Sequence, residues 1–239
     1  MQIINISTNN KPLVIHNNGP GHPDLWNRIT NWYFKTERHD NPPNNLTIVT
    51  WNNSPQKGIA EKSMNMLGAE YQQLDLGKRW IRKNKIDLNV QALKEITTDY
   101  VMGIDSYDVI ILSFKNIIDK FLSNNCDVLF SGELNDYPKV PFLREFEQSI
   151  AKSDFCHLNS GGWIGKTQQC LEFFKHCQET TNVDIVLADP RGHIPNDDQG
   201  ITRKVFFQKY PAIRIDYECN IFQCLYNVTN QVIIDELML

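Results

Sequence analysis

Short apolar runs alternate with segments of helical periodicity along most of this chain, and this alternation limits the possible folds more than any other feature. The apolar runs have the length and composition of buried strands. Strands are predicted over residues 46–51, 70–76 and 127–131, in a run ending at Asp105, and over 109–112. Helices are predicted over about 55–68, 88–97, 115–122, 167–178 and 198–207. This order is typical of an α/β sheet, and strands expected near 221–224 and 232–234 would form a smaller β layer.

Length and composition exclude several classes of protein. With 239 residues, 41% of them hydrophobic, the chain is long enough for one large domain with a sizeable core. A net charge of -4 gives no electrostatic case for binding nucleic acid or a membrane surface. No apolar run approaches the roughly 20 residues of a membrane span, and the first residues do not resemble a signal peptide, so a cytoplasmic location is predicted. The six cysteines form no C-x-x-C pair and are expected to be buried thiols.

A polar linker over residues 35–45, with two prolines and several asparagines, separates a short N-terminal unit from the α/β alternation. The unit, residues 1–34, contains a predicted strand over 12–15, a polar turn and a helix ending near Phe34. It is too small to hold a core of its own, so it must dock on the main body, residues 46–239. We therefore predict a single domain over residues 1–239.

The stretch from Asp99 to Leu112 carries the first candidate site. An apolar run ends at Asp105, and Asp108 precedes the next one. Two carboxylates three positions apart at a break between strands can converge on one hard divalent cation, such as Mn²⁺ or Mg²⁺, that also holds a diphosphate. Carboxylates in turns are also commonly solvated or capping residues, and this alternative stays open from the local pattern alone.

Three further clusters have both a functional and a purely structural interpretation. Residues 158–165 contain paired glycines that allow a ligand to approach the backbone, or that form a tight turn. Residues 196–199 contain two aspartates. In the functional interpretation they stabilise positive charge at an anomeric carbon, and in the structural one they cap a helix. Residues 16–20 place His16 before a polar turn, as a metal ligand or as an ordinary surface histidine.

Taken together, these clusters resemble one family. The segments Asp105-Ser-Tyr-Asp108, Leu158-Asn-Ser-Gly-Gly-Trp-Ile-Gly165, Asn196-Asp-Asp-Gln199 and Ile221-Phe-Gln223 resemble the N-terminal glycosyltransferase domain of the procollagen lysyl hydroxylases. Ser131-Gly-Glu133 followed by Tyr137-Pro138 fits the same pattern, and the similarity extends over nearly the whole chain. The resemblance implies a GT-A type, Rossmann-like sheet that binds a nucleotide sugar.

The order of the segments departs from the family. A segment resembling Pro12 to Pro20 lies near the C-terminal end of the family domain, whereas here it comes first. The chain is therefore similar to a circularly permuted member, with linker 35–45 joining the family's usual end to its usual beginning. Permutation is tolerated where native termini lie close together. We predict that residues 2–6 and 232–236 pair as antiparallel strands, and that residues 12–15 continue from the same sheet and bring His16 to the two aspartates.

The resemblance also implies roles for individual residues. The metal ligands, for Mn²⁺, are His16, Asp105 and Asp108. The nucleotide-binding residues are Thr50, Trp80, Ser106, Tyr107, Asn18 and Gly19, with Tyr107 stacked on uracil. The residues at the transfer centre are Asp197, Asp198 and Gln199. The residues under the donor or acceptor sugar are Glu133, Asn159, Ser160, Gly161 and Gly162. Where the family has a Gly-rich stretch with a lysine, this chain has Arg82 to Ile86, so Lys83 and Lys85 are the candidates for that cation.

The resemblance implies an enzyme that moves glucose from UDP-glucose to galactosyl-hydroxylysine in collagen-like peptides. One alternative is a galactosyltransferase that acts on hydroxylysine itself. Another is a module that binds sugar or collagen without catalysis. The oligomeric state is not predicted.

Overall fold

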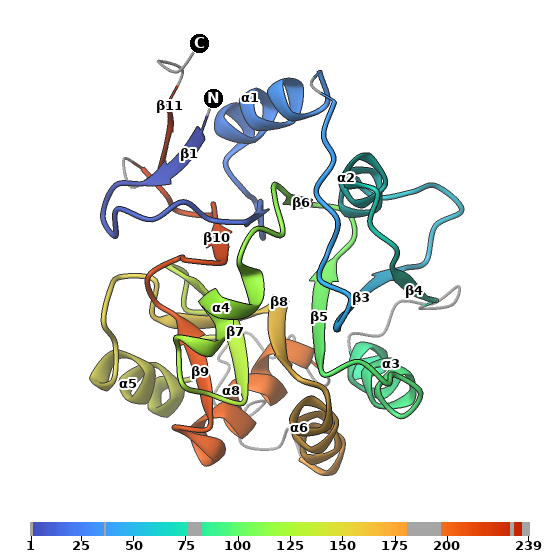
Figure 1. Ribbon diagram of the computed structural model, residues 1–239. Helices are drawn as coiled ribbons and strands as arrows, with labels where there is room; N and C mark the ends of the chain where they lie inside the picture. The colour runs from blue at the N-terminus through green and yellow to red at the C-terminus, as the bar shows by residue number, and fades with distance from the viewer. Residues whose placement is uncertain (1, 36, 76–82, 181–196, 230–231, 236–239) are drawn as a thin grey trace.

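The centre of the molecule is a six-stranded mixed sheet (Figure 1). The computed structural model describes residues 2–35, 37–75, 83–180, 197–229 and 232–235. The sheet has the order β4-β3-β5-β8-β7-β9. Its strands are β3 (Leu46–Asn52), β4 (Gln72–Asp75), β5 (Tyr100–Asp105), β7 (Val128–Glu133), β8 (His157–Lys166) and β9 (Ile213–Asp216). β8 runs antiparallel to both of its neighbours, and the other pairs are parallel. The predicted α/β fold of the GT-A type is confirmed.

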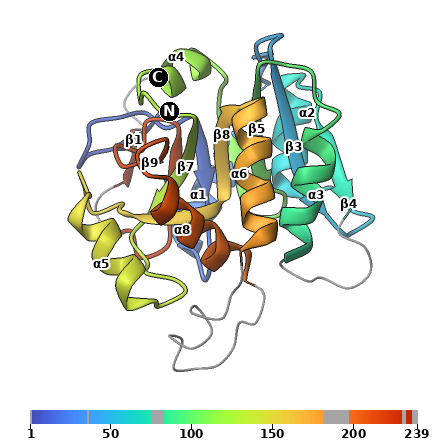
Figure 2. The same cartoon turned by 90° about the horizontal axis from the view of Figure 1, so that it is seen from below.

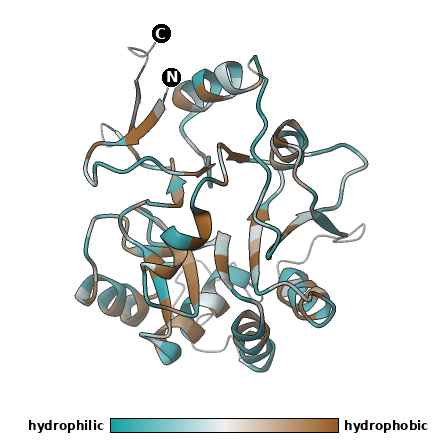
Figure 3. Ribbon diagram, viewed as in Figure 1, coloured by the Kyte–Doolittle hydropathy of each residue, from teal (hydrophilic) through white to brown (hydrophobic). Residues whose placement is uncertain are grey.

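Helices cover both faces of this sheet, so its strands are apolar on both sides (Figure 2). One face packs against α3 (Lys83–Leu93), α6 (Thr167–Glu179) and α8 (Asp198–Lys209). The other face packs against α2 (Ile59–Leu67) and α4 (Ile117–Leu122). α5 (Pro141–Ser149) contacts α8 at one end of the layer. Hydropathy colouring shows outer helices with an apolar and a polar side, which is why they remain at the surface (Figure 3).

A second, three-stranded sheet places the N-terminal unit beside the central sheet. It has the order β10-β2-β6, formed by β2 (Val14–His16), β6 (Val109–Ile111) and β10 (Phe222–Cys224). α1 (Pro23–Tyr33) follows β2 and buries Leu25, Ile29 and Tyr33 against a core that includes Ile15 and Ile110. Through these contacts β2 and α1 pack against residues of the main body.

The first and last described strands pair as predicted. β1 (Gln2–Asn5) lies antiparallel to β11 (Val232–Asp235), with Ile3 opposite Ile234 (Figure 1). They form a separate two-stranded sheet, so the expectation that β2 continues from the same sheet is wrong. For the same reason the predicted small β layer is divided, because β10 and β11 belong to different sheets.

Several element boundaries differ from the predicted ones. α3 begins at Lys83 and ends at Leu93, so it both begins and ends earlier than the helix predicted over about 88–97. Residues 158–165, where a turn was one interpretation, lie within the buried strand β8. α5 and β9 had no predicted counterpart. α2 begins after Gly58, where Glu61 accepts the backbone N–H of that residue, and it ends at Gly68 with a φ of 76°.

The six cysteines are buried and free, as expected. Among the helices that the structure describes, none combines the length and the apolar character needed to cross a membrane.

Candidate active site

A cleft of about 650 Å³ opens where the central and three-stranded sheets meet. The predicted site residues that line it are His16, Asn18, Gly19, Asp105, Asp108, Glu133, Asn159, Ser160, Gly161, Asp197, Asp198 and Gln199. They come from both ends of the sequence and from several strands. The fold therefore brings most of the predicted site together in one cavity.

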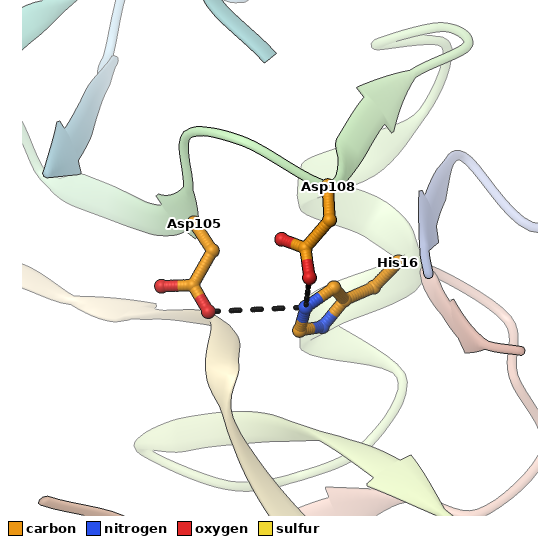
Figure 4. Close-up of side chains that lie close together, drawn as sticks. All are labelled: His16, Asp105 and Asp108. Atoms are coloured by element: carbon orange, nitrogen blue, oxygen red, sulfur yellow. Dashed lines mark ion pairs between the residues drawn. The ribbon is translucent and has the colours of Figure 1, made fainter. Parts of the chain in front are cut away.

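The candidate metal site is formed by His16, Asp105 and Asp108 (Figure 4). Asp105 ends β5, Asp108 precedes β6, and His16 ends β2, which pairs with β6. The Nε2 atom of His16 lies 3.4 Å from Oδ2 of Asp108 and 3.8 Å from Oδ2 of Asp105. Because each residue offers a ligand atom within 4.8 Å of the other two, the three side chains have the arrangement needed to share one cation. Two carboxylates and an imidazole suit a first-row divalent ion such as Mn²⁺.

His16 and Asp108 each favour the charged form of the other. Burial disfavours the charged imidazole, but the adjacent Asp108 carboxylate outweighs this effect and raises the pKa of His16 well above its ordinary value. Burial alone would raise the pKa of Asp108, but His16 lowers it. Without a cation, a charged imidazole therefore compensates the carboxylate, and a bound metal would displace the proton.

Glycine is required at position 161 because β8 passes directly beneath the metal site. A Cβ atom at Gly161 would collide with the imidazole of His16 and the carboxylate of Asp105. The paired-glycine motif therefore has a local function, which is to leave room for these two side chains to approach each other. Gly162 has a different environment: a Cβ there would meet the ring of Phe222, and Gly162 does not line the cleft.

The other side of the His16 ring faces β10. In the parallel pairing of β2 with β10, His16 lies opposite Cys224, and its Nδ1 atom is 4.0 Å from the Cys224 sulfur. That sulfur also lies 3.2 Å from the Ser131 hydroxyl. The ring is thus oriented with Nε2 toward the two aspartates.

Lys85 joins the metal site to the transfer centre. Its ammonium group lies 2.6 Å from Oδ1 of Asp105 and 3.7 Å from Oδ2 of Asp198, and it is 4.3 Å from the centre of the Trp51 ring. Burial would lower the pKa of Lys85, but Asp105 and Asp198 reverse this effect and raise it, so the group stays charged. Of the two candidate lysines, Lys85 is therefore in the cleft. The side chain of Lys83 lies outside the described residues.

The two aspartates at the start of α8 differ in their contacts. Asp197 is the N-cap, and its Oδ1 accepts the backbone N–H groups of Gln199 and Gly200 at 2.8 and 3.3 Å. The capping interpretation is therefore correct for Asp197. Asp198 accepts a 2.9 Å hydrogen bond from the Ser160 hydroxyl and lies beside Lys85. Both residues line the cleft, and Asp198 connects more directly to the metal site.

Glu133, at the end of β7, connects three parts of the site. Its carboxylate accepts hydrogen bonds from the side-chain amides of Asn18, Asn159 and Gln199 at 2.6, 3.0 and 2.9 Å. The oxygen of each amide in turn accepts a backbone N–H, which fixes the amide's orientation. Burial raises the pKa of Glu133 to about 7, even though the amides favour its charged form. Glu133 thereby holds the N-terminal unit, β8 and α8 in register.

The predicted nucleotide-binding residues are less closely grouped. Tyr107 is half exposed and does not line the cleft, and its hydroxyl lies 2.7 Å from Oδ1 of Asn52 and 3.0 Å from Oδ1 of Asn53. Thr50 and Ser106 are buried outside the cleft, where Thr50 donates to the Ile104 carbonyl and Ser106 to Glu61. Trp80 lies outside the described residues.

Sequence reasoning missed one wall of the cleft. This wall is formed by Asn135, Asp136, Tyr137 and Lys139, and Tyr226 and Pro20 add to the rim. No periodic pattern marks residues 135–139, and the Tyr137-Pro138 pair was the only local signal in that segment.

Comparison with known proteins places this chain in a family. A family model described as the PLOD GT domain matches residues 43–237. Procollagen-lysine,2-oxoglutarate 5-dioxygenase 1 of Bos taurus is 24% identical over 217 residues, which cover 84% of this chain and 28% of the relative. Multifunctional procollagen lysine hydroxylase and glycosyltransferase LH3 of Homo sapiens is 24% identical over 157 residues, covering 65% of this chain and 19% of the relative.

A viral relative is also similar. Uncharacterized protein R699 of Acanthamoeba polyphaga mimivirus is 25% identical over 187 residues, covering 73% of this chain and 37% of the relative. The aligned parts thus span well under half the length of these three relatives. Residues 1–42, which contain His16, lie outside the family match.

Proposed function

Because the chain belongs to the family of PLOD GT domains, we propose that it is a glycosyltransferase that moves glucose from UDP-glucose to galactosyl-hydroxylysine in collagen-like peptides. The observation that carries this proposal is the placement of His16, Asp105 and Asp108 beside Asp198 in a single cleft. A metal site next to an independently held carboxylate suits transfer from a sugar diphosphate, because the metal can stabilise the leaving diphosphate and the carboxylate the positive charge at the sugar.

His16, Asp105 and Asp108 would hold Mn²⁺, which when bound neutralises the charge that develops on the leaving diphosphate. Lys85 contributes a fixed positive charge between Asp105 and Asp198, so it offsets the repulsion among the carboxylates. Asp198, held by Ser160, is the carboxylate best placed to stabilise positive charge at the anomeric carbon. Asp197 positions this group by fixing the start of α8.

Glu133, Asn159 and Gln199 would form the floor under the transferred or accepting sugar. Their amides and carboxylate already satisfy one another in a buried network. A sugar hydroxyl that enters the cleft therefore meets groups whose positions are already set, which lowers the ordering cost of binding.

The proposal includes a circular permutation. Two observations support it: β1 pairs with β11, and the family match begins at residue 43, after the segment that supplies His16. In this arrangement the third metal ligand comes from the start of the chain and reaches the site through pairing of β2 with β6 and β10.

The test is a panel of UDP-sugars against deglycosylated and galactosylated collagen peptides, with Mn²⁺ or with a chelator. The proposal predicts metal-dependent transfer of glucose to the galactosylated peptide. Transfer of galactose to hydroxylysine would assign the alternative donor to the same site. Sugar or peptide binding without turnover of any UDP-sugar would contradict the enzymatic proposal.

A further inference from the structure

The wall of the cleft formed by residues 135–139 is held by one helix. Two α8 side chains one turn apart, Gln199 and Arg203, reach the backbone or side chains of three successive wall residues. Gln199 donates to the Tyr137 carbonyl at 2.6 Å. Arg203 donates to the Pro138 carbonyl at 2.6 Å and to Oδ1 of Asp136 at 2.9 Å.

Arg203 is fully buried, and four of its five N–H groups donate hydrogen bonds to neighbouring residues. Besides the wall, its guanidinium makes a two-pronged contact with Glu147 of α5, with Nε 2.9 Å from Oε1 and Nη2 2.6 Å from Oε2. His157 contacts the same carboxylate at 2.8 Å. A planar guanidinium can bind one carboxylate through two donors and still donate to a second acid and a carbonyl, whereas an ammonium group has only three donors.

This network also explains a second cluster of potential metal ligands. Asp136, Glu147 and His157 lie close enough together to bind an ion, but Arg203 already pairs with both carboxylates. The carboxylates of Asp136 and Glu147 pair with Arg203 and His157, so the cluster is an ion-pair network and not a metal site. Its effect is structural: it connects the wall to the helix whose first turn carries Asp198.

The geometry points to residues 135–139 as the wall that receives the acceptor, and to Arg203 as the positioning residue that holds this wall at a fixed distance from Asp198. This inference rests on the proposed transferase function. The metal site and Tyr107 lie at β5 and β6, whereas the wall follows β7, on the other side of β8 in the sheet. An acceptor bound along the wall approaches the transfer centre from the side of the sheet opposite Tyr107.

Arg203→Lys tests this inference because it keeps the charge but removes the planar fork. We expect Mn²⁺-dependent UDP binding and hydrolysis of UDP-glucose without acceptor to remain within about twofold of wild type. The kcat/KM for the acceptor peptide should fall about 10- to 100-fold, the effect expected from a displacement of about 1 Å at a reaction site. Arg214→Lys is the matched control: Arg214 also donates to two backbone carbonyls, those of Pro211 and Asn124, but neither of these residues lines the cleft.

Tyr137→Ala keeps the inference testable if Arg203→Lys does not fold. It removes a half-buried ring of the wall but leaves the backbone carbonyl that Gln199 contacts. The acceptor KM should rise while donor hydrolysis is kept. Unchanged acceptor kinetics in a folded variant, or equal losses of hydrolysis and transfer, would overturn the assignment of the wall to the acceptor. The proposed transferase function would not be affected by either result. A wild-type chain that transfers no sugar would instead overturn the proposed function and this inference with it.

Discussion

The Nε2 atom of His16 lies 3.4 Å from Oδ2 of Asp108, although 92 positions separate the two residues in the sequence. The antiparallel pairing of β2 with β6 brings them together, with His16 opposite Val109. Asp105 completes the cluster from the end of β5.

Removal of either aspartate should abolish transfer while the fold is kept. Asp105→Ala or Asp108→Ala removes charge stabilisation at the leaving diphosphate, and a loss of roughly 3 kcal/mol or more lowers kcat by at least about 100-fold. Initial rates in saturating Mn²⁺ measure the effect. Asp99→Ala is the matched control. Asp99 directly precedes β5, whereas Asp105 ends it, so this variant should keep full activity. Near-normal turnover by Asp105→Ala and Asp108→Ala would rule out the metal assignment.

Asp198 and Asp197 should respond differently to substitution. Asp198→Asn should lower turnover strongly and leave Mn²⁺ and UDP binding intact, because its contacts are to Ser160 and Lys85. Asp197→Ala removes the N-cap of α8 and should also cost about 1 kcal/mol of unfolding free energy. Calorimetry of UDP binding and chemical denaturation separate the two effects. Loss of UDP binding in Asp198→Asn, with turnover per bound donor kept, would show that the roles are wrong.

Gly161→Ala should weaken metal binding because its Cβ would lie between His16 and Asp105. We expect the affinity for Mn²⁺ to fall about 10- to 100-fold, as it does when groups that orient metal ligands are changed. Gly68→Ala is an informative contrast: its positive φ should cost about 1–2 kcal/mol in stability, with no change in metal affinity. Equal metal affinity in wild type and Gly161→Ala would contradict the steric argument.

Stability should decrease as the pH rises above 6.5. Burial disfavours the His157 imidazolium, but Cys156 and Glu147 outweigh this effect and raise its pKa from 6.5 to about 9. A raised histidine pKa stabilises the folded state fully below 6.5, and that stabilisation is lost as the pH rises through about 9. The shift corresponds to roughly 3 kcal/mol. Denaturation of wild type and His157→Gln between pH 6 and pH 10 measures it, and parallel stability curves for the two proteins would refute the coupling.

Deletion of residues 1–8 should destabilise the whole domain, although chain ends are usually dispensable. It removes β1, exposes the surface that buries Ile3, and leaves Gln223 without the 2.7 Å hydrogen bond from Asn5. The expected loss is about 3 kcal/mol or more. His16→Ala is the contrasting variant, with weaker Mn²⁺ binding and nearly unchanged stability. A truncated protein as stable as wild type would show that the β1–β11 pair does not contribute to the fold.

Local sequence patterns predicted much of the scaffold because burial and periodicity are local properties. The strand ending at Asp105 and the helix after Asp197 were found in this way. The pairing of β1 with β11 followed from the resemblance and its changed segment order, and the structure confirms it.

What local patterns could not show depends on distant contacts. β8 contains paired glycines typical of a turn, yet it is a central strand, and Gly161 leaves space there for the His16 ring. Lys85 precedes the helix predicted over about 88–97, whereas packing of α3 on α6 places it on a helix that reaches the cleft. The wall at residues 135–139 is set by Arg203, more than 60 positions away, and no local pattern encodes that contact.

The most direct test of the proposed activity is UDP release from UDP-glucose in the presence of a galactosyl-hydroxylysine peptide, measured with Mn²⁺ and again with a chelator. The account predicts UDP release and a glucosylated peptide with Mn²⁺, and neither with the chelator or in Asp105→Ala. Release that does not require a divalent cation, or that persists in Asp105→Ala, would contradict the central claim that His16, Asp105 and Asp108 form the metal centre of a glycosyltransferase.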